Sequence, residues 1–89
     1  MDLTAHASIR AQQRGIPVKV VAHLYRFGET KNSRGATSLF VTRKSLEEAA
    51  GELTKQEIQN LRRYSNSYLV IGENERVITV ARSRQKSHS

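Results

Sequence analysis

The chain contains no cysteine, and this absence limits how a domain of its size can be held together. Its 89 residues are enough for one domain. A chain of this length buries about two-thirds or less of the surface that its unfolded form exposes, so its core must be thin. Without cysteine, a disulfide-stapled secreted fold is excluded and a zinc ribbon or finger is disfavoured. The fold must therefore depend on the packing of helices and strands alone.

Two helices are predicted in the first third of the chain. The first spans about 5–14, with Thr4 as its N-cap and Gly15 just past its end. Pro17 suits the first position of a second helix over about 17–26, which has a valine-rich apolar side. Because the connection between them is so short, we expect the two helices to form a helical hairpin.

The middle of the chain is predicted to contain a strand and then two short helices. Residues 29–35 are rich in turn-forming types and indicate a turn or loop between short strands, whereas residues 38–43 indicate an apolar strand. Two capping-box patterns follow, and they predict helices over about 46–50 and 55–64. The two boxes pair Ser45 with Glu48 and Thr54 with Glu57.

Two further strands, about 68–71 and 76–82, are predicted at the end of the chain, joined by a tight turn. The order of elements indicates a single α+β domain over 1–82. Its helical hairpin packs on a small antiparallel sheet, and the helical segment 45–64 is inserted between strands. The basic tail over 83–89 is expected to be flexible.

The chain is strongly basic, with a formal net charge of +7. Ten of its fifteen basic residues are arginine, whose guanidinium binds phosphate through two parallel hydrogen bonds. Residues 1–44 hold eight of the basic residues and only two acidic ones. This distribution favours a polyanionic partner, above all a nucleic acid. The simpler alternative is a protein that is basic without binding a polyanion.

His6, Arg10 and Arg14 follow one another at intervals of four residues, which places them along one side of the first predicted helix. Histidine titrates at a pKa of ~6.5, so His6 is suited to proton transfer near neutral pH. Arg10 and Arg14 could clamp a scissile phosphate and stabilise its developing charge. In the alternative interpretation, His6 packs or caps at a helix end, and the arginines serve solubility or pair with acids elsewhere.

Other residues are candidates for the opposite side of a phosphate site formed by His6, Arg10 and Arg14, and for contacts with RNA. Thr79 and Arg82, on the last predicted strand, would complete the catalytic set. His23, on the polar side of the second helix, is expected to be solvated. The residues predicted to bind RNA are basic side chains and one aromatic ring that could stack a base: Lys19, Arg34, Arg43, Tyr68 and Arg84.

Several common catalytic patterns are absent from the sequence. It has no phosphate-binding loop, dinucleotide fingerprint, zinc-protease helix or nucleophile elbow. Carboxylates are scarce outside 45–64, so carboxylate-based metal catalysis is not expected. Proton transfer by His6 with charge stabilisation by arginine needs no cofactor. No signal peptide and no apolar run long enough to span a membrane is present, and a cytoplasmic location is expected.

The start of the chain resembles the signature of a bacterial domain family of unassigned function. The string is His6-Ala7-x-x-Arg10-x-x-x-Arg14-Gly15-Ile16, followed by a valine-rich helix that ends at Gly28-Glu29. The closing strand of that family resembles Val77-Ile78-Thr79-Val80 here. The family is similar to the RelE and BrnT toxins, which are small ribonucleases that need no metal. The resemblance covers about 1–43 and 67–82.

The resemblance implies a RelE-like fold and a metal-independent endoribonuclease, the toxin of a toxin–antitoxin pair. Such an enzyme cleaves RNA, ribosome-bound mRNA included, by attack of the RNA's own 2′-hydroxyl, and it has an acidic antitoxin protein as partner. The motif carries roles only to His6, Arg10, Arg14 and Thr79. Two features depart from RelE: the insertion at 45–64, and the lack of a strand before the first helix.

Two alternatives stay open, a non-catalytic nucleic-acid-binding module and a protein-interaction domain that docks an acidic partner.

Overall fold

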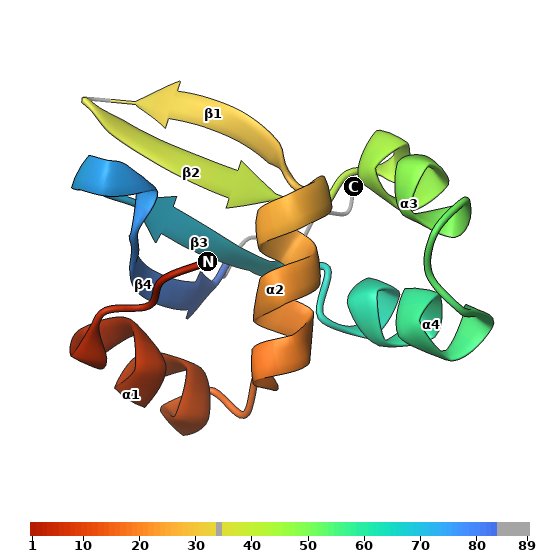
Figure 1. The fold of residues 1–89 in the computed structure, drawn as a ribbon, viewed down its shortest axis with the longest axis horizontal. Coiled ribbons are helices and arrows are strands. Elements are labelled where there is room, and N and C mark those ends of the chain that lie inside the picture. Colours follow the sequence, from red (N-terminus) through yellow and green to blue (C-terminus); the bar gives the residue numbers. More distant parts are fainter. Residues whose placement is uncertain (34, 84–89) are drawn as a thin grey trace.

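A computed structural model describes residues 1–33 and 35–83 of the chain (Figure 1). Its centre is a four-stranded antiparallel sheet with the strand order β1-β2-β3-β4. The strands are β1 (Glu29–Ser33), β2 (Ala36–Phe40), β3 (Ser67–Ile71) and β4 (Val77–Arg82). Each strand pairs with the next strand of the chain, although a long segment separates β2 from β3. The fold class is therefore α+β, as predicted.

The described residues also form four α-helices: α1 (Ala5–Gln13), α2 (Val18–Phe27), α3 (Arg43–Ala50) and α4 (Lys55–Arg63). α1 packs along β4, whereas α2 packs against β2 and β3 and also contacts α3 and α4 (Figure 1). The helices inserted between β2 and β3 thus extend the structure beside α2 and away from α1.

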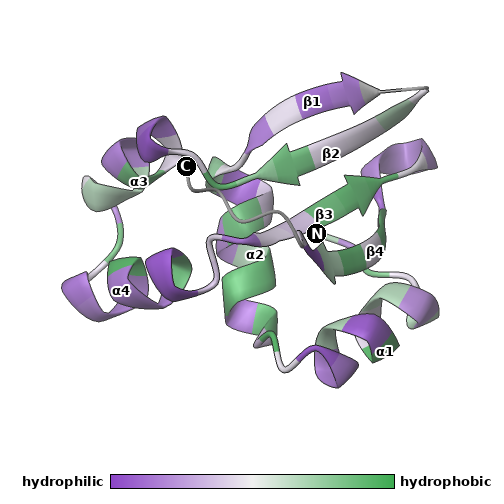
Figure 2. Cartoon of the chain, turned by 180° about the vertical axis from the view of Figure 1, so that it is seen from behind, coloured by the Kyte–Doolittle hydropathy of each residue, from purple (hydrophilic) through white to green (hydrophobic). Residues whose placement is uncertain are grey.

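The core lies between α2 and one face of the sheet. Leu39, Leu69 and Val80 are directly opposite one another across β2, β3 and β4, and all three are buried. Val21 and Leu24 of α2 are buried in the same cluster. Green apolar segments on α2, β3 and β4 contrast with the mostly purple β1 and α4 in Figure 2. Burying each large aliphatic side chain contributes roughly 1.5–3 kcal/mol, so these residues stabilise the packing of α2 on the sheet.

Small residues attach α1 to the sheet. Ala7 and Ala11 lie four residues apart on the helix and are buried, at 0% and 2% exposure. Their short side chains allow the helix to approach β4 closely, since no bulky group separates the two backbones. The side chains that flank this buried stripe are thereby held at the edge of the sheet.

The segment before α1 pairs with β4, although no strand is predicted there. Leu3 forms a short parallel bridge with Val77. The Thr4 N–H donates to the Val77 carbonyl at 3.0 Å, and the Val77 N–H donates to the Asp2 carbonyl at 2.8 Å. The chain therefore enters α1 from the outer edge of β4, and this pairing fixes where the helix begins.

The predicted caps of α1 and α4 are confirmed. The Thr4 hydroxyl accepts from the Ala7 N–H at 3.1 Å, and Gly15 has a φ of 67°, which suits glycine after a helix. Thr54 and Glu57 form a reciprocal capping box at the start of α4. These features depend on neighbours within one turn, so sequence alone could specify them.

Two predictions for residues 29–43 are wrong. Most of the expected loop 29–35 is strand β1, a polar edge strand that forms because it pairs along its whole length with β2. The expected strand 38–43 is displaced, since β2 ends at Phe40 and Arg43 already belongs to α3. The helix begins early because Thr42, rather than Ser45, is its N-cap. The two side chains hydrogen bond reciprocally to each other's backbone N–H at 3.1 and 3.2 Å.

Candidate functional site

The basic stripe of α1 is defined by His6, Arg10 and Arg14, and it borders the buried side of the helix. His6 and Arg14 are exposed and Arg10 is half-buried. Within the described residues, the side chains of His6 and Arg10 make no hydrogen bond and no ion pair. The sequence has no acidic residue between Asp2 and Glu29, so neither α1 nor α2 supplies a counter-charge. These groups are therefore available to an anion from outside the domain.

Arg82 lies at the C-terminal end of α1, next to Arg14. Its Nη2 donates to the Arg14 carbonyl at 3.1 Å, and its guanidinium lies 5.9 Å from the centre of the Tyr64 ring. A helix end leaves carbonyl groups without partners and carries a partial negative charge, so a cation is stabilised there. Arg82 thus ties the end of β4 to the end of α1.

The stripe is evenly spaced along α1, and Arg82 distinguishes its C-terminal end. A rise of 1.5 Å per residue separates the Cα atoms of His6 and Arg14 by about 12 Å along the helix axis, with Arg10 about 6 Å from each. His6 and Arg10 can therefore reach one phosphate together. Arg14, about two turns from His6 and one turn from Arg10, forms a second cationic position together with Arg82.

Thr79 does not join this stripe. It is directly opposite Val70 of β3, and the neighbouring Val80 is buried in the core that also contains residues of α2. Side chains alternate between the faces of a strand, so Thr79 lies on the face that α2 leaves uncovered. Arg82, three residues further on, belongs to the other face and cannot form one wall with Thr79.

Tyr68 lies on the same uncovered face and stacks against Phe40. Their ring centres are 5.4 Å apart and the ring planes differ by 20°. Both rings are half-buried. Phe40 is not among the site residues that the sequence predicts, because it lies within the predicted apolar strand 38–43. The alternation of Phe40 with buried Leu39, and of Tyr68 with buried Leu69, is the signal that separates the two faces.

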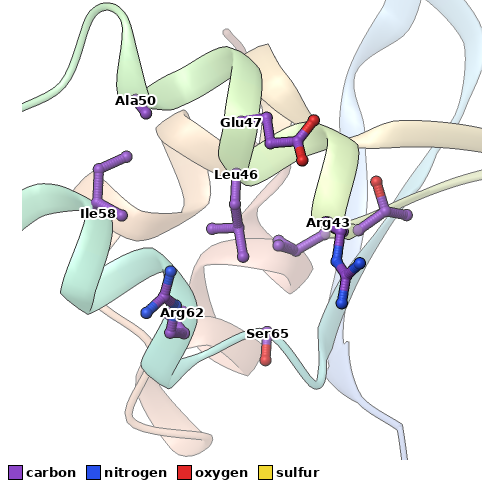
Figure 3. A pocket seen from close by; sticks show the side chains of 9 residues that line it. Arg43, Leu46, Glu47, Ala50, Ile58, Arg62 and Ser65 are labelled. Carbon is purple, nitrogen blue, oxygen red and sulfur yellow. The ribbon is translucent and has the colours of Figure 1, made fainter.

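Arg43 lies elsewhere, beside a groove between α3 and α4 with a volume of about 720 Å³. Figure 3 shows Arg43 of α3 and Arg62 of α4 on either side of Leu46. Leu46 and Ile58 contribute apolar surface, and the lining includes the acidic Glu47. The groove does not include any residue of the α1 stripe.

Lys19 and His23 of α2 lie near Glu57 of α4. The pKa of Glu57 is lowered, first by its hydrogen bond from the Thr54 N–H at 2.9 Å and more weakly by the positive charges of His23 and Lys19. The expectation that His23 is solvated is wrong. It is half-buried where α2 packs on α4, and its Nδ1 is buried without a hydrogen-bond partner among the described residues.

The predicted RNA-binding residues are therefore dispersed over the molecule. Tyr68 is on the uncovered sheet face, Arg43 is beside the α3–α4 groove, and Lys19 is on α2. Arg34 and Arg84 lie outside the described residues.

Comparison of the chain with protein-family models, with curated proteins and with solved structures gives no match. In the part of the chain that the structure describes, no three His, Asp or Glu side chains lie close enough together to hold a metal ion. No helix within 1–33 or 35–83 is long and apolar enough to cross a membrane.

Proposed function

We propose that the protein is a RelE-like endoribonuclease that cleaves RNA without a metal ion and uses the N-terminal part of the α1 stripe. The observation that carries this proposal is the pair His6 and Arg10. These side chains lie one turn apart, and neither has a partner among the described residues. An imidazole and a guanidinium at this spacing can act on one phosphodiester.

The chemistry needs a proton transfer and the stabilisation of negative charge. The RNA 2′-oxygen forms a bond to phosphorus while the bond from phosphorus to the 5′-oxygen breaks, which leaves a 2′,3′-cyclic phosphate and a 5′-hydroxyl. One proton leaves the 2′-hydroxyl and one is added to the departing oxygen. His6 would handle one of these protons, and Arg10 would stabilise the charge on the phosphorane oxygens. Arg14, beside Arg82, would hold a neighbouring phosphate of the strand.

The element order is compatible with the expected RelE-like arrangement of two N-terminal helices and an antiparallel sheet. The bridge at Leu3 supports it further, because it supplies a strand-like segment where RelE has a strand before the first helix. The toxin role and an acidic antitoxin as partner belong to the same proposal. The basic charge of the chain supports both RNA and an acidic protein as partners.

A second candidate function is RNA binding without cleavage. The observation that favours it is the exposure of His6 on a convex helix, outside the α3–α4 groove. A general acid or base is usually held in a cleft that positions the reacting atoms and excludes water. In this case the stripe would bind phosphates, and His6 would be dispensable.

The experiment is cleavage of a 5′-labelled single-stranded RNA by purified protein in the presence of EDTA. We expect fragments that end in a cyclic or 3′-phosphate. His6→Ala should lower the rate about 10²–10⁴-fold because proton transfer is lost. Arg10→Ala should lower it about 10²–10³-fold because charge stabilisation is lost.

Two exposed residues provide matched controls. Gln12 lies on the side of α1 opposite to His6 and Arg10, and Gln12→Ala tests that side. Arg63→Ala removes an exposed arginine of α4. Both variants should cleave at the wild-type rate. A folded His6→Ala protein with wild-type activity contradicts the proposed mechanism. Wild-type protein that binds RNA but yields no fragments indicates the second candidate function.

A further inference from the structure

The uncovered face of the sheet carries one row of residues with an unusual composition. Strand register places Glu29, Phe40, Tyr68 and Ala81 directly opposite one another across β1, β2, β3 and β4. Residues opposite one another in antiparallel strands lie on the same face, with Cβ atoms about 4.5–5.5 Å apart. The row therefore runs from a carboxylate through two stacked rings to a small side chain.

The rings of this row can accept nucleobases. A flat aromatic ring stacks any base, and such platforms are typical of single-stranded RNA binding. The stacked rings of Phe40 and Tyr68 leave one outer face each. The strand register places Ala81 next to Tyr68 on one side of the pair, and Glu29, on the edge strand β1, next to Phe40 on the other. Among the described residues, the hollow next to this row lies on the Phe40 side, which makes the outer face of Phe40 the candidate position for a base.

The position beside Phe40 is hollowed. A depression of about 410 Å³ is lined by Glu29, Phe40 and neighbouring residues of β1 and of the chain after β2. This volume falls within the range of about 300–1,000 Å³ that is usual for small-molecule sites. A base stacked on Phe40 would lie in this depression, next to the carboxylate.

Glu29 is the only acidic residue on this face among the described residues. It is half-buried, and within the described residues its side chain has no hydrogen bond or ion pair, even with Lys31 two residues away on the same strand face. A carboxylate is repelled by RNA phosphates, so a nucleotide beside Glu29 would have to offer a group that donates hydrogen bonds to it. An ionised carboxylate only accepts them, and it can accept two in parallel.

The base that meets this requirement is guanine, whose Watson–Crick edge presents two adjacent donors, the N1–H and the 2-amino group. Adenine and cytosine present one amino donor beside an acceptor nitrogen, and uracil presents one donor between two acceptors. We propose that the uncovered sheet face binds single-stranded RNA and seats a guanine on Phe40, with Glu29 accepting from its N1–H and 2-amino groups. This inference rests on the proposed function, since it assumes that RNA is the ligand.

The test measures binding of labelled 2′-O-methyl oligoribonucleotides, which cannot be cleaved by 2′-hydroxyl attack, by fluorescence anisotropy. Four hexamers of uridine carry G, A, C or U at one central position. Wild-type protein should bind the guanine hexamer about tenfold more tightly than the others, because one bidentate contact discriminates by this order. Glu29→Gln should reduce this preference to within about twofold, while Phe40→Leu should weaken binding of the guanine hexamer about tenfold.

The matched control is Glu73→Gln, which removes an exposed carboxylate from the turn between β3 and β4. It should leave the guanine preference unchanged. Thermal unfolding of each variant verifies that it is folded, and Tyr68→Leu provides a second test of the ring platform if Phe40→Leu is unfolded. Equal binding of all four hexamers, or a guanine preference that survives Glu29→Gln, overturns this inference and leaves the proposed function intact. If wild-type protein neither binds the hexamers nor cleaves RNA, the proposed function fails as well.

Discussion

At the scale of residues, Arg82 has a different environment from His6 and Arg10. Arg82 already has two partners within the domain, the Arg14 carbonyl and the Tyr64 ring, whereas His6 and Arg10 have none among the described residues. A side chain held at a helix end acts first on the position of that helix. We therefore interpret Arg82 as a residue that positions Arg14, and His6 and Arg10 as the groups that would touch the scissile phosphate.

Substitution of Arg82 separates these roles. Arg82→Ala removes one hydrogen bond and one cation–π contact, both exposed, so the free energy of unfolding should fall by about 1 kcal/mol in urea titrations. Arg82→Lys keeps the charge and should recover part of this loss. RNA cleavage by Arg82→Ala should fall less than that of Arg10→Ala. A large loss of cleavage without any loss of stability would instead indicate direct contact between Arg82 and RNA.

At the scale of elements, the junction from α2 to β1 requires a glycine at position 28 because neighbouring backbone lies very close to its Cα, not because of an unusual φ angle. Gly28 has a φ of −65°, which any residue can adopt. A Cβ atom there would lie 2.5 Å from the Leu24 carbonyl oxygen and 3.2 Å from that of Phe40. The glycine therefore lets α2 end directly against β2, and this contact sets the start of β1, where Glu29 lies.

The capping box of α4 is expected to make stability depend on pH. The pKa of Glu57 in the folded protein is below its ordinary value of 4.5, so the charged carboxylate stabilises the fold at pH above that value. This contribution is lost as the pH falls through the lowered pKa. Glu57→Gln keeps the hydrogen-bond acceptor but removes the charge.

Urea unfolding of the wild type and of Glu57→Gln checks this expectation. The wild type should be more stable near neutral pH, and the difference should shrink as the pH is lowered through the range below 4.5. A difference that does not change with pH would show that the charge of Glu57 contributes nothing to the cap.

At the scale of the whole molecule, positive charge is spread over several surfaces rather than gathered at one. The α1 stripe, the pair Arg43 and Arg62 beside the groove, and Lys31 on the uncovered sheet face belong to different elements. Within the described residues, ion pairs join only Arg26 to Glu52 and Arg76 to Asp2. The remaining excess of positive charge favours association with a polyanion, and this attraction should weaken as the salt concentration rises.

The salt dependence of RNA binding reports how many phosphates the protein contacts. If three phosphates are held, the logarithm of the association constant should fall with the logarithm of salt concentration at a slope of about −2 for a single strand. Arg10→Ala should make this slope shallower by about 0.7, while Gln12→Ala should not change it. A slope near zero would contradict a phosphate-based interface.

The sequence by itself determined the features that depend on neighbours within one turn. The caps at Thr4 and Thr54 were predicted correctly, because a hydroxyl before a helix can satisfy the free N–H groups of its first turn. The α+β class followed from periodicity along each segment. The stripe of His6 and Arg10 also followed from helical spacing, although its role remains a proposal.

Only the tertiary structure decided which residues meet across the sheet. β1 is too polar to be recognised as a strand, and it exists because β2 supplies its partners along the whole edge. The stacking of Phe40 on Tyr68, with Glu29 beside them, depends on a register between strands that are distant in sequence. Register arises from the burial of Leu39 against Leu69 on the other face, and no local pattern in the sequence encodes that pairing.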